Sequence, residues 1–247
     1  MASAPTPSPE TTAPVSSVGR IFGVIFSPKP TFESIAQKPT WIVPLIVLTL
    51  LSIGVSSILA ARADWREVVR EQLDKSGRLD KIPQEKREDT ISGGAVFAKY
   101  ITYTAGFVGP AIGALISTAI YLVAFNVILG AGLKFKTSFS IVSYASVPSG
   151  LRAILGSVIL LLKDPSTINP NNFVASNIAA FLSSDSPKWL LTLGTFLDVF
   201  AFWGLVLTAI GFSAANPKKL KLGTALGVVF GVYVVIVLLF VGLAAIT

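Results

Sequence analysis

The chain has 247 residues, of which 52% are hydrophobic and 13% charged, with a net charge of +7. This charged share is about half that of soluble domains. Because Cys and His are absent, disulfides, thiol nucleophiles and imidazole metal ligands are excluded. The basic residues flank apolar stretches, which indicates membrane topology rather than nucleic-acid binding. We expect no metal, no cofactor and no nucleic-acid partner.

The N-terminal region divides into two parts. Residues 1–17 are mostly Ala, Ser, Thr and Pro, which predicts a disordered tail rather than a cleavable signal peptide. Residues 18–40 are amphipathic and are interrupted by Pro28, Pro30 and Pro39. We expect two short helices in the membrane interface, with apolar faces in lipid and lysines toward the headgroups. An ordinary cytosolic loop is the alternative.

Five later stretches are apolar over lengths that cross a bilayer core of roughly 30 Å. Since backbone polar groups in lipid must bond within the protein, uninterrupted apolar runs indicate helices. We therefore predict an all-α polytopic membrane bundle with five transmembrane helices over residues 41–247. The expected spans are about 41–61, 110–131, 139–162, 189–212 and 222–246.

Residues 62–100 form the one long hydrophilic loop, with apolar side chains at helical spacing between Asp64 and Lys75. A helical extracytoplasmic cap is expected here. Two prolines interrupt apolar stretches, and we expect helix breaks at Pro110 and Pro148. The residues before Pro110 are expected to lie along the interface.

Orientation follows from two connections, 134–136 and 216–221, which are short and carry only basic charges. The positive-inside rule places them in the cytoplasm. This predicts a multi-pass protein of the cell membrane with a cytoplasmic N-terminus and an extracytoplasmic C-terminus. A raw count of Lys and Arg opposes this orientation, because the long outer loop holds more of them.

Arg152 and Asp198 are the ionisable residues inside the expected spans. A charge at the bilayer centre costs about 2.5–3.5 kcal/mol on insertion scales, so it usually has a partner or a function. Both residues lie about 15 Å from the outer ends of their helices. We predict an Arg152–Asp198 ion pair that orients two helices. The alternative is a polar site for an ion, a proton or a lipid headgroup.

Two features indicate helix packing. Asn126 in the second span is expected to make an interhelical hydrogen bond. Gly223, Gly227 and Gly231 recur every four residues on one face of the last helix, which permits close approach of another backbone. The neighbour could belong to this chain or to another copy. No metalloprotease, hydrolase or P-loop motif is present, so we expect no enzymatic activity.

Several short segments carry a family resemblance. They are FSPKPTFESIAQKPTWIVPLIVL at the first span, PQEKRED before the second, SYASVPSGL in the third and FLDVFAFWGLVLTAIGF in the fourth. A short lysine loop and a Gly-rich last helix follow. Together, from about Gly19 to the end, these segments resemble the Yip family, the membrane proteins named as Rab/Ypt-GTPase interactors.

The resemblance implies five spans, a cytoplasmic N-terminus and an extracytoplasmic C-terminus. Pro148 matches the family's third-span pattern, and Asp198 and Trp203 match its fourth-span pattern. The chain lacks the DLYGP-type segment of the eukaryotic branch, so the resemblance points to a prokaryotic relative. It does not carry Rab-type GTPase binding over to this chain.

Our leading hypothesis is a non-enzymatic membrane scaffold that binds membrane partners, including other copies of itself, or organises lipids. The alternative is a component of a small-solute or ion transporter or channel that uses the Arg152–Asp198 site. Broken helices and buried charges line substrate paths, which motivates this alternative. Against it, the chain shows no inverted repeat.

Overall fold

The computed structural model describes residues 16–183 and 185–246, so most of the expected tail, 1–17, lies outside the described residues. Within them the chain is helical, and no β-strand forms beyond a single bridge. Four helical segments are long and apolar enough to cross a membrane. These segments are Ile42–Arg62, Gln84–Ile128, Phe135–Leu162 and Leu222–Ile246. The prediction of an all-α bundle with several membrane-spanning helices is confirmed.

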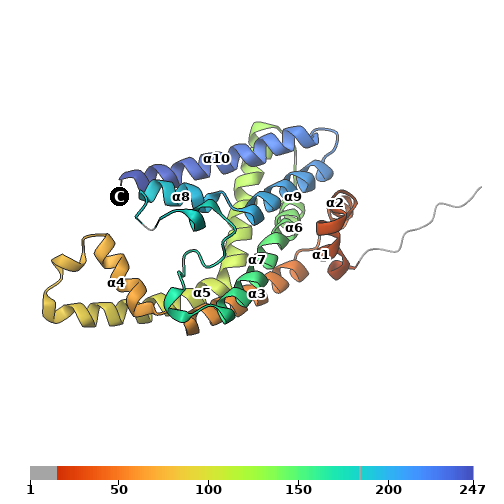
Figure 1. The fold of residues 1–247 in the computed structure, drawn as a ribbon. Coiled ribbons are helices and arrows are strands. Elements are labelled where there is room, and N and C mark those ends of the chain that lie inside the picture. The colour runs from red at the N-terminus through yellow and green to blue at the C-terminus, as the bar shows by residue number, and fades with distance from the viewer. Residues whose placement is uncertain (1–15, 184, 247) are drawn as a thin grey trace, which may run out of the picture.

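The bundle is built around helix α3 (Ile42–Arg62), which packs against both α5 (Gln84–Val123) and α7 (Val147–Leu162). Helix α9 (Val199–Ala215) packs against α7 and against α10 (Leu222–Ile246). Figure 1 shows the described N-terminal helices and the C-terminus at opposite ends of this bundle.

A charged helical arm extends from the end of the bundle that holds the C-terminus (Figure 1). Its helix α4 (Trp65–Lys75) begins at Asp64, whose carboxylate accepts hydrogen bonds from two backbone N–H groups, both at 3.1 Å. The chain turns at Gly77, where φ is +62°, a conformation that glycine adopts without strain. A short 3-10 turn, Leu79–Lys81, leads into α5.

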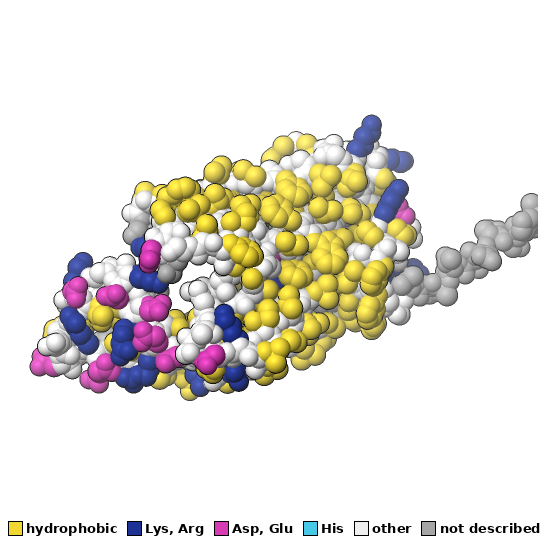
Figure 2. Space-filling view, viewed as in Figure 1, with side chains coloured by type: hydrophobic (Ala, Val, Ile, Leu, Met, Phe, Trp, Pro, Cys, Tyr) yellow, Lys and Arg dark blue, Asp and Glu magenta, His cyan; other side chains and the backbone are white. Residues whose placement is uncertain are grey.

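The arm consists of α4 packed against the start of α5. Arg66 and Arg70 both pair with Glu88 of α5, at exposed positions where water screens the charges and such pairs add little stability. The Glu67 carboxylate accepts a hydrogen bond from the Arg70 guanidinium. Together with Glu88, it raises the pKa of Arg70. Figure 2 shows acidic and basic side chains mixed over this arm, whereas the middle of the bundle is apolar.

The second expected span, 110–131, lies within a longer helix, because α5 runs without interruption from Gln84 through Pro110 to Val123. A π-helical turn, Ala124–Ile128, extends it to 45 residues, or about 67 Å at 1.5 Å each. Pro110 does not break the helix, because a missing N–H removes only one helical hydrogen bond. In Figure 1 the helix bends partway along, so that its early part lies beside α4 and its later part rises toward α10.

The third expected span forms as α6 (Phe135–Ala145) followed by α7, with Ser146 as the one residue between them. Pro148 occupies the first turn of α7 rather than the interruption itself. That position suits proline, since the first-turn N–H groups have no intrahelical partner.

The fourth expected span, 189–212, is not one helix. Leu197 and Asp198 separate helix α8 (Lys188–Phe196) from α9, which begins at Val199. With 9 and 17 residues, both helices are shorter than the roughly 20 residues of a typical membrane-spanning helix. The physical reason is the capping of α9 by Asp198.

The second N-terminal helix does not turn its apolar face outward to lipid, as expected for 18–40, because that face packs on protein. Helices α1 (Ser17–Phe26) and α2 (Pro28–Gln37) contact each other, and α2 packs against α6 and α9. Phe32 and Ile35 of α2 are fully buried in the protein core. Gly211 of α9 allows this approach, because a Cβ there would lie 3.0 Å from the Phe32 ring.

A buried arginine holds these helices in place. The Nη1 atom of Arg20 donates to the carbonyl of Lys38 at 2.9 Å and to Thr40 Oγ1 at 3.0 Å, and Nη2 donates to Ser34 Oγ at 2.8 Å. These acceptors lie at and just beyond the C-terminal end of α2, where a cation is favourable. Tyr144 of α6 adds a hydrogen bond from its hydroxyl to the carbonyl of Ser17, at 3.1 Å.

One edge of α1 stays exposed. Val18, Phe22 and Phe26 lie four residues apart and are 57%, 60% and 79% exposed. This edge is the part of the amphipathic segment that remains free to contact lipid.

Replacing Phe32 tests the docking of α2. Phe32→Ala should lower the free energy of unfolding by about 3–5 kcal/mol, because it leaves a cavity in the core. The exposed Phe22→Ala is the matched control and should change stability little. Thermal unfolding of the purified protein in detergent measures both; equal effects of the two changes would contradict the docked position of α2.

Candidate functional site

The candidate site is the interruption between α8 and α9. Asp198 lies in extended conformation, with φ −107° and ψ 132°, and forms an antiparallel bridge with Asn177 of the preceding connection. The N–H of Val199 donates to the carbonyl of Ser176 at 3.0 Å. The connection between α7 and α8 therefore re-enters the bundle, and its Val174 and Asn177 are buried.

Asp198 sets the position of this interruption. Its Oδ1 accepts a hydrogen bond from the N–H of Ala201 at 3.0 Å, which makes it the N-cap of α9. The end of α8 is also satisfied, since the Tyr233 hydroxyl of α10 donates to the carbonyl of Phe196. The sequence signal was available: an Asp directly before an apolar helical run is a helix-start pattern.

The structure brings the two predicted ionisable residues together. Asp198 Oδ2 lies 3.5 Å from Arg152 Nε. Ser176 bridges them: its hydroxyl donates to Asp198 Oδ2 and accepts from Arg152 Nε at 3.3 Å. The Asp198 side chain is 10% exposed and that of Arg152 34%. Ser176 was missed from sequence because nothing in a turn-rich connection marks one serine for this role.

The C-terminal end of α7 fixes where the re-entrant connection starts. Arg62 of α3 donates from Nη2 to the carbonyl of Lys163 at 2.9 Å. The next residue, Asp164, caps the short turn Pro165–Thr167. Ser166 donates to its carboxylate from Oγ at 2.7 Å and from N at 2.9 Å, which lowers the pKa of Asp164.

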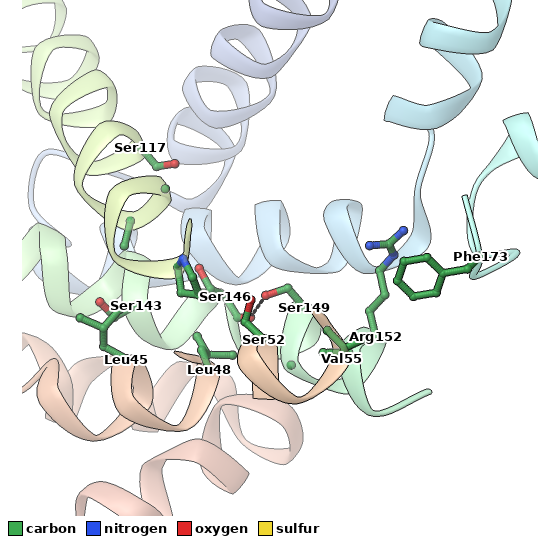
Figure 3. A pocket seen from close by; sticks show the side chains of 15 residues that line it. Leu45, Leu48, Ser52, Val55, Ser117, Ser143, Ser146, Ser149, Arg152 and Phe173 are labelled. Carbon is green, nitrogen blue, oxygen red and sulfur yellow. Dashed lines mark hydrogen bonds between the residues drawn. The ribbon is translucent and has the colours of Figure 1, made fainter. Parts of the chain in front are cut away.

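A cavity of about 400 Å³ adjoins Arg152, with walls from α3, α5, α6 and α7. Figure 3 shows Arg152 and Phe173 at one end of it and Leu45 and Ser143 at the other. Five serines line it: Ser52, Ser117, Ser143, Ser146 and Ser149.

The serine hydroxyls differ in their hydrogen bonding. Those of Ser143, Ser146 and Ser149 donate to backbone carbonyls three or four residues earlier in the chain, at 2.5–2.8 Å. Among the described residues, the hydroxyls of Ser52 and Ser117 have no hydrogen-bond partner, and neither do Nη1 and Nη2 of Arg152. The cavity therefore offers unused donors inside an apolar bundle. No cluster of acidic side chains among the described residues could hold a metal.

Asn126 does not make the expected bond to another helix. Its side-chain amide closes the loop that follows its own helix, donating to the carbonyl of Leu133 at 2.9 Å and accepting from that residue's N–H at 2.7 Å. Gly130 and Gly132 in this loop have φ of +58° and +66°. The tight loop satisfies the amide locally, so no second helix is needed.

The expected glycine packing is also absent within the described chain. A Cβ built on Gly223, Gly227 or Gly231 would meet no atom within 4 Å. Close approach occurs instead at Gly106 of α5, where a Cβ would lie 2.6 Å from the Ser56 hydroxyl. Helix α10 lies at the edge of the bundle, so its glycine face has no neighbour there.

Comparison with known families decides the identity of the chain. A model of the Yip1 domain matches residues 22–246, which include nearly every helix described above. The chain belongs to the Yip1 domain family. The resemblance noted from sequence is thereby confirmed.

One curated relative of this Yip1 domain protein is "Membrane protein YknW" of Bacillus subtilis (strain 168). It is 26% identical over 220 residues, which cover 87% of each chain. No solved structure matches the chain. The family and this relative agree with a multi-pass membrane location.

Substitutions at Asp198 separate its two roles. Asp198→Asn keeps a capping side chain but leaves Arg152 without a counter-charge, so it should lower the unfolding temperature. Adding Arg152→Gln to it should recover part of that loss, with a coupling energy of about 0.5–3 kcal/mol. Asp198→Ala should cost about 1 kcal/mol more than Asp198→Asn, because the cap is also lost.

Thermal unfolding in detergent measures this set of variants. Asp185→Asn is the control. Asp185 is exposed in the same connection between α7 and α8, so this change should leave the unfolding temperature unaltered. If Arg152→Ala and Asp198→Ala both unfolded at the wild-type temperature, the result would contradict a stabilising ion pair.

Proposed function

We propose that this Yip1 domain protein is a non-enzymatic membrane scaffold whose last helix binds another transmembrane helix. The supporting observation is the open face of α10, defined by Gly223, Gly227 and Gly231. Glycines four residues apart let two helix backbones approach closely in lipid, where packing rather than hydrophobicity drives association.

The opposite side of α10 is the one that contacts the rest of the chain. Ala225 and Val229 are fully buried there, about half a turn around the helix from Gly227. The bundle thus uses one face of α10 and leaves the glycine face available. The partner is another copy of this chain or a different membrane protein; the family match does not extend Rab-type GTPase binding to it.

We do not propose transport. The alternative of a transporter or channel component rests on the Arg152–Asp198 site, and neither the family match nor the name of the relative supports it. The described contacts of that pair are those of a structural joint between α7, the re-entrant connection and α9.

For topology we propose five crossings, with α8 and α9 together forming the fourth. Two connections support a cytoplasmic position for the N-terminal end. Lys219 Nζ donates to the carbonyl of Gly130 at 2.7 Å and Asn216 Nδ2 to that of Ala131 at 2.8 Å, which joins the two basic loops. The positive-inside rule assigns such a basic end to the cytoplasm of the cell.

Cysteines introduced into this Cys-free chain test the topology. Lys75→Cys in the arm should react with a membrane-impermeant maleimide in intact cells. Lys218→Cys in the last basic loop should react only after permeabilisation. Reaction of both positions from one side would contradict an odd number of crossings between them.

Gly227→Leu tests the proposed scaffold role. In-membrane crosslinking of the wild type should yield a higher-mass species, and this change should reduce its yield at least about tenfold, or about 1.4 kcal/mol. Gly54→Leu on α3 is the matched control, because a Cβ there also meets no atom within 4 Å. An unchanged crosslinked species in Gly227→Leu would contradict the glycine face as the binding surface.

A further inference from the structure

The serine-lined cavity between α3, α5 and α7 has a use beyond the joint that Arg152 makes with Asp198. Its charged end is Arg152, whose contacts with Ser176 and Asp198 are made through Nε alone. Within the described residues, Nη1 and Nη2 remain without hydrogen-bond partners, and one third of the side chain is exposed. Four N–H donors of a cavity-lining arginine are therefore left for an acceptor from outside the chain.

A bare guanidinium edge in hydrocarbon is unfavourable unless an acceptor satisfies it. The two Nη atoms form a planar fork that matches two oxygens of one phosphate. Asp198 already balances the single positive charge of Arg152 through Nε, so a phosphodiester would supply hydrogen-bond acceptors to Nη1 and Nη2 rather than a counter-charge. Phe173 lies beside the guanidinium in Figure 3 and forms the wall at this end.

The rest of the cavity suits the body of an amphiphile. Its wall on α3 runs from Leu45 to Val55, about 15 Å along the helix axis. In Figure 3, Leu45 and Leu48 line the part of the cavity far from Arg152, together with Ser143, whose hydroxyl is already bonded to the carbonyl of Phe139. Ser52 lies between the two ends in Figure 3, and its unused hydroxyl can donate to an ester carbonyl.

Size and access agree with such a ligand. The volume of about 400 Å³ lies within the range of about 300–1,000 Å³ found for small-molecule sites. Gly113 and Ser149 on the walls are exposed, so the cavity opens to the surroundings of the bundle. A lipid can therefore enter sideways from the bilayer.

We propose that this cavity binds one phospholipid, with the phosphate on Nη1 and Nη2 of Arg152. One acyl chain lies along the apolar end near Leu45 and Leu48, and Ser52 donates to an ester carbonyl. The proposal does not depend on the scaffold role, since α10 forms no wall of the cavity.

Filling the cavity is the first test. Gly113 lines it, and a Cβ there would meet no atom within 4 Å, so Gly113→Leu should fold while occupying the space. Gly54→Leu is again the control, because it adds the same side chain at an open position outside the cavity. Native mass spectrometry of each protein, purified in dodecyl maltoside and incubated with phosphatidylglycerol, counts the bound lipids.

We expect the wild type and Gly54→Leu to retain one phospholipid. In Gly113→Leu, the fraction of protein with bound phospholipid should fall at least about tenfold. The double change Arg152→Gln with Asp198→Asn removes both charges of the pair while keeping polar side chains, and it should weaken binding similarly. Thermal unfolding without lipid verifies that each variant is folded. Wild-type occupancy in folded Gly113→Leu overturns the proposal.

Three additives distinguish the source of the bound oxyanion. Phosphatidylglycerol should raise the unfolding temperature of the wild type and of Gly54→Leu but not of Gly113→Leu. Inorganic phosphate and decanoate at equal concentration should produce less than half of that shift. An equal shift with inorganic phosphate would overturn the lipid assignment in favour of a small-anion site, and an equal shift with decanoate would overturn the requirement for a phosphate.

Discussion

The fold depends on the carboxylate of Asp198, which uses both of its oxygens. Oδ1 caps α9, while Oδ2 accepts from Ser176 and lies next to Arg152. This one side chain therefore marks the interruption between α8 and α9, binds the re-entrant connection and joins α7 to α9. In lipid each of these polar groups needs a protein partner, because water is not available to replace it.

The same constraint explains the neighbouring polar contacts. The carbonyl at the end of α8 has the Tyr233 hydroxyl, and backbone groups of Ser176 and Val199 pair with each other. Arg20 and Tyr144 do the equivalent work at the other end of the bundle, where they bind the ends of α1 and α2. Among the described residues, the buried side-chain atoms without a hydrogen-bond partner are Nε of Arg20 and Arg62 and the Ser138 hydroxyl.

The distribution of glycines shows how packing divides between the chain and its surroundings. Gly106 and Gly211 let α5 approach α3 and α9 approach α6, at distances that a Cβ would not permit. The glycines of α10 meet no neighbour in the chain. Regular spacing in the sequence therefore did not identify the internal contacts, since close approach depends on which residue a neighbouring helix presents.

The sequence by itself determined the helical membrane class and the family, because apolar length and short motifs are local properties. It also identified Arg152 and Asp198, since intramembrane charges are rare. Tertiary structure decided that Pro110 leaves α5 continuous and that Asp198, not a proline, interrupts the fourth stretch. It also decided that Asn126 closes its own loop and that α2 packs on protein rather than lipid. The reason is that each outcome depends on a partner distant in sequence, such as Ser176 for Asp198 or Gly211 for Phe32. Local patterns contain no information on which distant groups will meet.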